Sequence, residues 1–227
     1  IDILRAVNAL QDQDLQSATC GVWPWHLEEP LAEMSSPDFN WADFCGAHLA
    51  QILFANSQQL PEKLKLSMQK SLRLASQQIK VRNVKPGYTN IAVLGGIVCA
   101  SAGELLNVPE LVDYGRSRLQ AVVEHTKQHV GFSEYISPHY CKVVIAECDR
   151  GLQLIEDAET RQAIKWLRTR ARKVVAESFH LATAQWPGPQ SRSSRDRLRK
   201  STAACTPTRI LTEITPHLPR AADAPPA

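Results

Sequence analysis

Apolar residues recur at every third or fourth position along most of the chain, and the alternation typical of β-strands is nearly absent. This period predicts helices that each bury one face. Turns rich in Pro, Gly and Asn separate the apolar stretches. The predicted helices are one that begins at Ile1 and six more at residues 41–58, 61–83, 89–107, 109–129, 139–155 and 158–182.

The six later helices form three consecutive pairs, which begin near residues 41, 89 and 139. The spacing is therefore 48 and then 50 residues, although the sequence itself does not repeat. In each pair the first helix is the more apolar, as expected for an inner helix covered by an outer one. The spacing predicts an all-α fold of helical hairpins from an (α/α) toroid, incomplete because six hairpins need a chain about twice as long.

The helix expected at residues 89–107 is almost entirely apolar, which places it at the centre of the fold. Gly95 and Gly96 lower its helix propensity by roughly 1 kcal/mol each. We therefore expect these glycines to serve close contact between helices or an open pocket.

The end of the chain differs in composition from the rest. Half of the 14 prolines fall in the last 41 residues, and residues 191–200 are a run rich in Ser and Arg. We therefore expect a toroid-like helical domain at residues 1–192 and a poorly ordered tail, basic and rich in Pro, at residues 193–227.

The charge and hydropathy of the chain exclude several partners. The formal net charge is +3, of which residues 185–227 carry +4, and so a near-neutral body argues against nucleic acid. No apolar run reaches the ~18 residues of a membrane span. Without an initiator Met or a visible signal segment, we expect the N-terminus to be missing, and localisation stays open. An incomplete ring exposes apolar helix faces, which favours a homo-oligomer.

The cysteines and histidines predict neither a metal site nor a cofactor. Six cysteines show no CxxC motif and no metal-ligand spacing, and we expect them to be reduced residues, mostly in the core. His125 and His129 lie four residues apart on one predicted helix face. No HExxH motif surrounds them, and the dipole at a helix C-terminus favours His without any metal. We therefore expect no metal site at this pair.

Candidate sugar-binding residues gather in the loop at residues 20–30. Trp23, Trp25, His26 and Glu28 would form a saccharide platform, because indole rings pack on sugar C–H faces and carboxylates accept hydrogen bonds from hydroxyls. The alternative is a packed loop whose tryptophans anchor it to the helices.

Candidate acid–base and anion-binding groups lie in two further loops. Asn90 opens the central helix after Tyr88, where it is either a cap or an amide donor for a carboxylate or oxyanion. Tyr135 and His139 are a workable acid–base pair. The alternative is a Ser-Pro helix start with packed aromatic residues. This second stretch carries Glu134, Tyr135, His139 and Tyr140.

A fourth loop, at residues 185–192, follows the last predicted helix. Its Trp186 and Arg192 flank a Gly/Pro turn that would close a pocket and place a guanidinium on a carboxylate, and the alternative is a helix terminator leading into the tail. In a ring of hairpins, alternate loops reach the same end of the inner bundle. We therefore expect the four loops to converge.

Three motifs resemble those of a mostly uncharacterised family of bacterial and fungal proteins, which is similar to the α/α-toroid domain of alginate and heparinoid lyases. The resemblance covers roughly residues 20–195. Where the family has Asn, Thr and His, this chain has Ile136, His139 and Gln190, and it is inactive if a lost group carries the chemistry. The motifs are Gly87-Tyr88-Thr89-Asn90-Ile91, Phe132-Ser133-Glu134-Tyr135-Ile136-Ser137-Pro138 and Gln185-Trp186-Pro187-Gly188-Pro189-Gln190-Ser191-Arg192.

The resemblance implies a lyase that cleaves uronate-containing glycans by β-elimination, with an acidic oligo- or polysaccharide as its partner. Asn90 and Arg192 would neutralise the uronate carboxylate, and so stabilise the carbanion-like transition state. Tyr135 and His139 would act as base and acid. The implied substrate contacts are Trp23, Trp25, His26, Glu28, Tyr88, Glu134, Tyr140, Trp186 and Gln190.

Two other classes of function stay open. A glycoside hydrolase needs two carboxyl groups ~5–9 Å apart across a cleft, for which Glu28 or Glu134 and Asp43 are the candidates. A non-catalytic helical-repeat scaffold, or an inactive relative, would instead let the loops splay apart.

Overall fold

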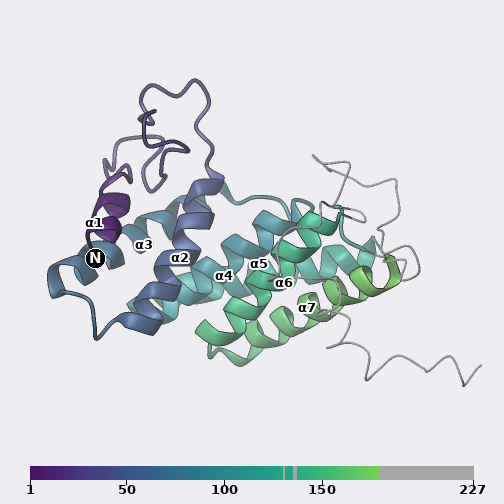
Figure 1. Ribbon diagram of the computed structural model, residues 1–227. Helices are drawn as coiled ribbons and strands as arrows, with labels where there is room; N and C mark the ends of the chain where they lie inside the picture. The colour runs from purple at the N-terminus through teal and green to yellow at the C-terminus, as the bar shows by residue number, and fades with distance from the viewer. Residues whose placement is uncertain (130, 135–136, 179–227) are drawn as a thin grey trace, which may run out of the picture.

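The structure is a computed structural model that describes residues 1–129, 131–134 and 137–178 (Figure 1). Within these ranges there are helices and no strand, which confirms the all-α prediction. The predicted bounds of α2 to α6 lie within two residues of the observed ones. The predicted end of α7 and the tail at residues 193–227 lie outside the described residues. The helices are α1 (Asp2–Ala9), α2 (Asn40–Asn56), α3 (Glu62–Arg82), α4 (Thr89–Leu106), α5 (Pro109–Gln128), α6 (Pro138–Leu154) and α7 (Ala158–Ser178).

The residues at the helix ends explain why the bounds were predictable. Asn83 and Asn107 end α3 and α4 in the left-handed conformation, with φ of 42° and 54°, which Asn tolerates better than most residues. Ser137 caps α6 by accepting a hydrogen bond from the backbone N–H of Tyr140. Pro138 follows at the first helical position, where its missing N–H is not needed.

The helix α4 is the centre of the bundle. It packs against α2, α3, α5 and α6, and 83% of it is buried. By length and hydropathy alone it resembles a membrane span, and its burial identifies it as the core helix. Each first helix of a pair packs on the second, and α2, α4 and α6 also contact one another. These contacts agree with the predicted hairpins, while closure into a toroid stays a prediction.

Two glycines allow α4 to approach its neighbours closely. A Cβ atom on Gly95 would lie 2.5 Å from Oδ1 of Asp43, and one on Gly96 would lie 2.9 Å from Cγ of Leu119. On the facing helix, a Cβ atom on Gly115 would lie 2.6 Å from the backbone oxygen of Gly96. Close contact between helices, one of the two roles expected for these glycines, is therefore confirmed.

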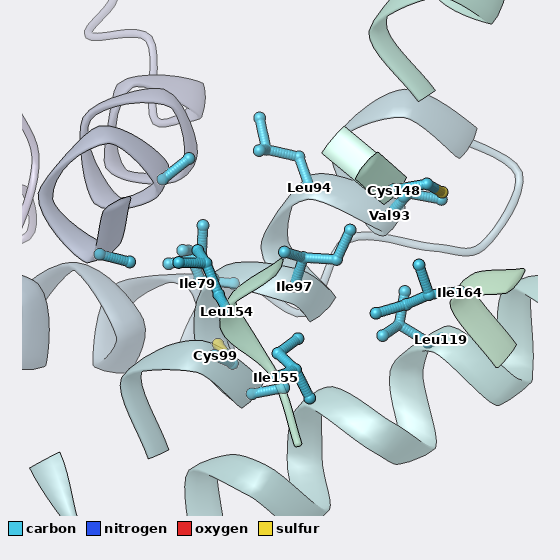
Figure 2. Packing of buried hydrophobic residues seen from close by; sticks show 14 of the residues in the cluster. Ile79, Val93, Leu94, Ile97, Cys99, Leu119, Cys148, Leu154, Ile155 and Ile164 are labelled. Carbon is cyan, nitrogen blue, oxygen red and sulfur yellow. The ribbon is translucent and has the colours of Figure 1, made fainter. Parts of the chain in front are cut away.

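The apolar core lies between α4 and the helices around it (Figure 2). Burial raises the pKa of the Cys99 and Cys148 thiols, which disfavours their reactive thiolate form. All five cysteines in the described part of the chain are free, as predicted, and Cys205 lies outside it. Core side chains labelled in Figure 2 include Ile79, Leu94, Ile97, Leu119, Leu154, Ile155 and Ile164.

The segment from residue 10 to residue 39 contains no helix and links α1 to α2. Asp12 exchanges two backbone hydrogen bonds with residues 21 and 22, which closes a compact loop. Trp23 then enters the core, where it is 2% exposed, and its Nε1 donates to the carbonyl of Val7. These bonds hold α1 in place, and α1 packs against α3.

Candidate functional site

Polar side chains from several helices and loops gather around the first turn of α4. Hydrogen bonds link the start of α2 to Tyr88, the end of α3 to the start of α2, and the loop before α6 to Asn90. The regions before α2, α4 and α6 therefore meet at one end of the bundle. Of the four loops expected to converge, these bonds join those at residues 84–90 and 131–139, and residues 185–192 lie outside the described residues. We call this group the α4-start cluster. Its members are Asn40, Asp43, Arg82, Tyr88, Thr89, Asn90, Arg118, His125, Ser133 and Glu134.

The first turn of α4 binds a carboxylate that belongs to the chain itself. Glu134 is 4% exposed, and its Oε2 accepts a hydrogen bond of 2.8 Å from the backbone N–H of Asn90. A negative charge at this end of a helix is favoured by the helix dipole. Tyr88, and not Asn90, is the N-cap residue. In the described part of the chain, Oγ1 of Thr89 and Oδ1 of Asn90 are buried without a hydrogen-bond partner.

A histidine and a serine face each other beside this turn. Nε2 of His125 lies 2.9 Å from Oγ of Ser133, within hydrogen-bond distance. The ring of His129 lies against the His125 ring, with centroids 4.1 Å apart. Burial and the neighbouring His129 lower the pKa of His125, which favours its neutral form at pH 7. Gly87 leaves room for this contact, because a Cβ atom at residue 87 would lie only 3.3 Å from Oγ of Ser133.

A buried carboxyl group lies on the other side of the turn. Asp43 is 2% exposed, and its Oδ2 lies 3.5 Å from NH1 of Arg82. The same guanidinium donates to Oδ1 of Asn40 at 2.7 Å, and the Asn40 amide lies 3.5 Å from the Tyr88 hydroxyl. The ends of α2, α3 and α4 are thereby joined through side chains.

Burial dominates the titration of Asp43. It raises the pKa of the carboxyl to about 7, although the charges of Arg82 and Arg118 act in the opposite direction. Arg118 itself donates to Oδ1 of Asn83 at 2.9 Å and to the backbone carbonyl of Val84. The charges of two arginines therefore act on one carboxyl group whose pKa burial has raised towards neutral pH.

The two tryptophans of the N-terminal loop have different environments. Trp23 is buried and hydrogen-bonded to α1, so it anchors the loop to the helices, as in the alternative to a saccharide platform. Trp25 is 55% exposed and lies beside His26 and Trp41, with ring centroids 6.1 and 6.0 Å apart. Trp41 continues to Phe44 at 5.8 Å. Trp25, Trp41 and Phe44, which we call the aromatic strip, lie on and beside the first turns of α2.

The other predicted site residues are placed as follows. Glu28 and His139 are exposed, and the His139 ring lies 5.2 Å from the Tyr140 ring in an edge-to-face contact. Asn90 and Glu134 are brought together, and so are Tyr88 and the start of α2. Tyr135, Trp186, Gln190 and Arg192, which the sequence also predicted as site residues, lie outside the described residues.

The sequence reasoning missed the two arginines of the α4-start cluster. Arg118 follows Leu111 by seven residues and precedes Val122 by four, so it interrupts an apolar helical stripe. Asp43 stands in the same register as the buried Ala47. A charged residue within an apolar stripe indicates a buried charge that needs partners, and this signal would have found Arg118, while Asp43 was already among the candidate carboxyl groups.

A family model described as a domain of unknown function, DUF8769, matches residues 1–204. No curated protein and no solved structure shows significant similarity to the chain.

Proposed function

We propose that this chain, which belongs to the domain family of unknown function DUF8769, is a carbohydrate-active protein that binds acidic glycans at its α4-start cluster. The observation that carries the proposal is the meeting of three loop regions at one end of the bundle. It brings the aromatic strip, of which Trp25 is exposed and Trp41 and Phe44 are partly buried, beside a group of buried polar and charged side chains. Sugar sites combine these two elements, because rings pack on C–H faces and polar groups recognise hydroxyls and carboxylates.

The charges of the cluster suit an anionic sugar. Arg82 and Arg118 carry two positive charges around Asp43, whose raised pKa leaves it only partly ionised at neutral pH. The Glu134 carboxylate is compensated by the positive end of α4. Arg82 is partly exposed, so its guanidinium is the described cation best placed to meet a uronate carboxylate.

The proposed chemistry is β-elimination. A base removes the proton next to the uronate carboxylate, the electron pair forms a carbon–carbon double bond, and the 4-linked oxygen leaves with a proton from an acid. We assign Tyr135 and His139 to the base and acid, with Asn90 and Arg192 neutralising the carboxylate. Glu134, which precedes Tyr135 in sequence, accepts a hydrogen bond from the backbone N–H of Asn90, and this bond joins two residues of the proposed site.

The test is to incubate the chain with a panel of uronate polysaccharides and to follow the ultraviolet absorbance of the unsaturated product. We expect product with at least one polysaccharide, and none with the Tyr135→Phe variant. Binding of the same polysaccharide to the variant, measured by calorimetry, separates loss of chemistry from loss of the fold.

Binding has its own test at the aromatic strip. We expect Trp25→Ala to weaken polysaccharide binding about tenfold, because a stacked ring is lost. Phe54→Ala is the matched control, since Phe54 is 51% exposed and lies near the opposite end of α2. Equal effects of the two substitutions would contradict a sugar site at the strip.

A second candidate is binding without catalysis. Two of the three carboxyl candidates for hydrolysis are engaged within the chain, because Glu134 is bonded to the backbone of α4 and Asp43 is paired with Arg82. This argues against hydrolysis and leaves binding without catalysis as the alternative to elimination. Binding that Trp25→Ala weakens, without product from any polysaccharide, would select this function. Release of reducing ends without an unsaturated product would instead select a glycoside hydrolase.

A further inference from the structure

A concave surface lies far from the α4-start cluster. It is a groove of about 550 Å³ between α1, the residues that follow it and the first turns of α3. Its volume falls within the range of small-molecule sites. Arg82 of the cluster lies nineteen positions after Lys63 of the groove on α3, a distance of about 28 Å along the helix. The polar side chains that line it are Arg5, Asn8, Gln11, Gln13, Lys63 and Ser67.

Two buried amide side chains of this groove have acceptor atoms without a donor. Asn8 is 4% and Gln11 is 5% exposed. In the described residues, Oδ1 of Asn8 and Oε1 of Gln11 have no hydrogen-bond partner. A buried polar atom without a partner costs about 1–3 kcal/mol, so two in one groove indicate donors from outside the chain.

The neighbours of Gln11 fix the orientation of its amide. Its Nε2 donates to the carbonyls of Gly21 and Ser71, at 3.1 and 2.9 Å. Both partners are acceptors only, so the amide cannot be reversed, and Oε1 is the atom without a donor. Nδ2 of Asn8 lies 2.8 Å from Oγ of Ser67, on the α3 side of the same groove.

The edge of the groove carries positive charge. Lys63 and Arg5 both line it, from α3 and α1. Arg5 forms an ion pair with Asp2, and both side chains are largely exposed, so this pair opens at little cost. A ligand that pairs with all of these groups therefore carries hydroxyl groups, which donate to the amide oxygens of Asn8 and Gln11. It also carries an anionic group, which binds the two cations at the edge of the groove.

We propose that this groove binds a small polyhydroxylated anion, such as a sugar acid or a sugar phosphate. A sugar acid and a sugar phosphate both carry several hydroxyl groups and one anionic group. The site is independent of the proposed glycan function, because it uses none of the residues of the α4-start cluster.

The test is calorimetric titration of the full chain with four probes. We expect D-glucuronate or glucose 6-phosphate to bind, and the stronger of the two identifies the anion. Glucose lacks the anion and cyclohexanecarboxylate lacks the hydroxyls, so both should bind at least threefold more weakly. Added salt should weaken binding of the anionic sugar, because its contacts with the two cations are exposed.

Substitutions locate the site without disturbing its buried amides. We expect Lys63→Gln to weaken binding of the anionic sugar about threefold, as for an exposed ion pair. Lys80→Gln is the matched control, since Lys80 is an exposed lysine near the other end of α3. Trp25→Ala should leave this binding unchanged, which separates it from a glycan site. The proposal is overturned by no binding, by equal binding of glucose, or by equal effects of the two lysine substitutions.

Discussion

Replacing Asp43 by Asn should change how the stability of the fold depends on pH. In the folded chain burial raises the pKa of this carboxyl to about 7, from its ordinary value of 3.8. The folded state therefore binds the proton more tightly than the unfolded state. This contribution to stability is fully present below pH 3.8 and is lost as the pH rises through 7.

The expected magnitude follows from these two values. Between pH 5 and pH 8 the carboxyl of the wild-type chain should lose about 2.5 kcal/mol of its contribution to the free energy of unfolding. An Asn amide has nearly the same shape and does not titrate in this range. The stability of Asp43→Asn relative to the wild-type chain should therefore rise by about 2.5 kcal/mol over the same interval.

The assay is urea unfolding of both chains at pH 5 and pH 8, followed by circular dichroism. Taking the difference between the chains removes the contributions of other titrating groups, such as Glu147 and His125. A relative stability that is the same at both pH values would refute the reasoning. A change in the opposite sense would show that Arg82 and Arg118 outweigh burial and hold Asp43 ionised.

Two further substitutions test the packing and the polar contacts of α4. Gly96→Ala should destabilise the fold by about 1–3 kcal/mol through a clash with α5, whereas Gly131→Ala, which has only an arginine tip 3.7 Å away, should change little in the same urea assay. Glu134→Gln should lower the free energy of unfolding by about 1 kcal/mol at neutral pH, because the anion at the start of α4 is lost. Glu124→Gln, at an exposed pair with a lysine, is its control, and equal losses would contradict a specific role for Glu134.

The sequence predicted the helices well because local chemistry determines their ends. Asn83 and Asn107 stop α3 and α4, and Ser137 with Pro138 starts α6. Each of these signals acts within a few residues, so it needs no knowledge of the tertiary fold. The two glycines of α4 were also informative, since they have no other use in the middle of a helix.

The candidate site was less predictable because its contacts join residues far apart in the chain. Arg82 reaches Asn40 across 42 positions, and Glu134 reaches Asn90 across 44. The pattern around Trp23 and Trp25 has no helical period, so nothing in it indicates which indole is buried. Only the positions of Asp43 and Arg118 on apolar stripes carried a usable signal, and it pointed to buried charges without naming their partners.

The central position of α4 has a consequence for how the chain opens. Linear arrays of hairpins lose their end units one at a time, because each unit touches only its neighbours. Here one helix contacts four others, so the bundle around it cannot lose a hairpin without exposing α4. Amide hydrogens of α4 should therefore exchange with solvent only when the whole bundle unfolds. The short α1, which packs on α3, belongs to the part that opens first.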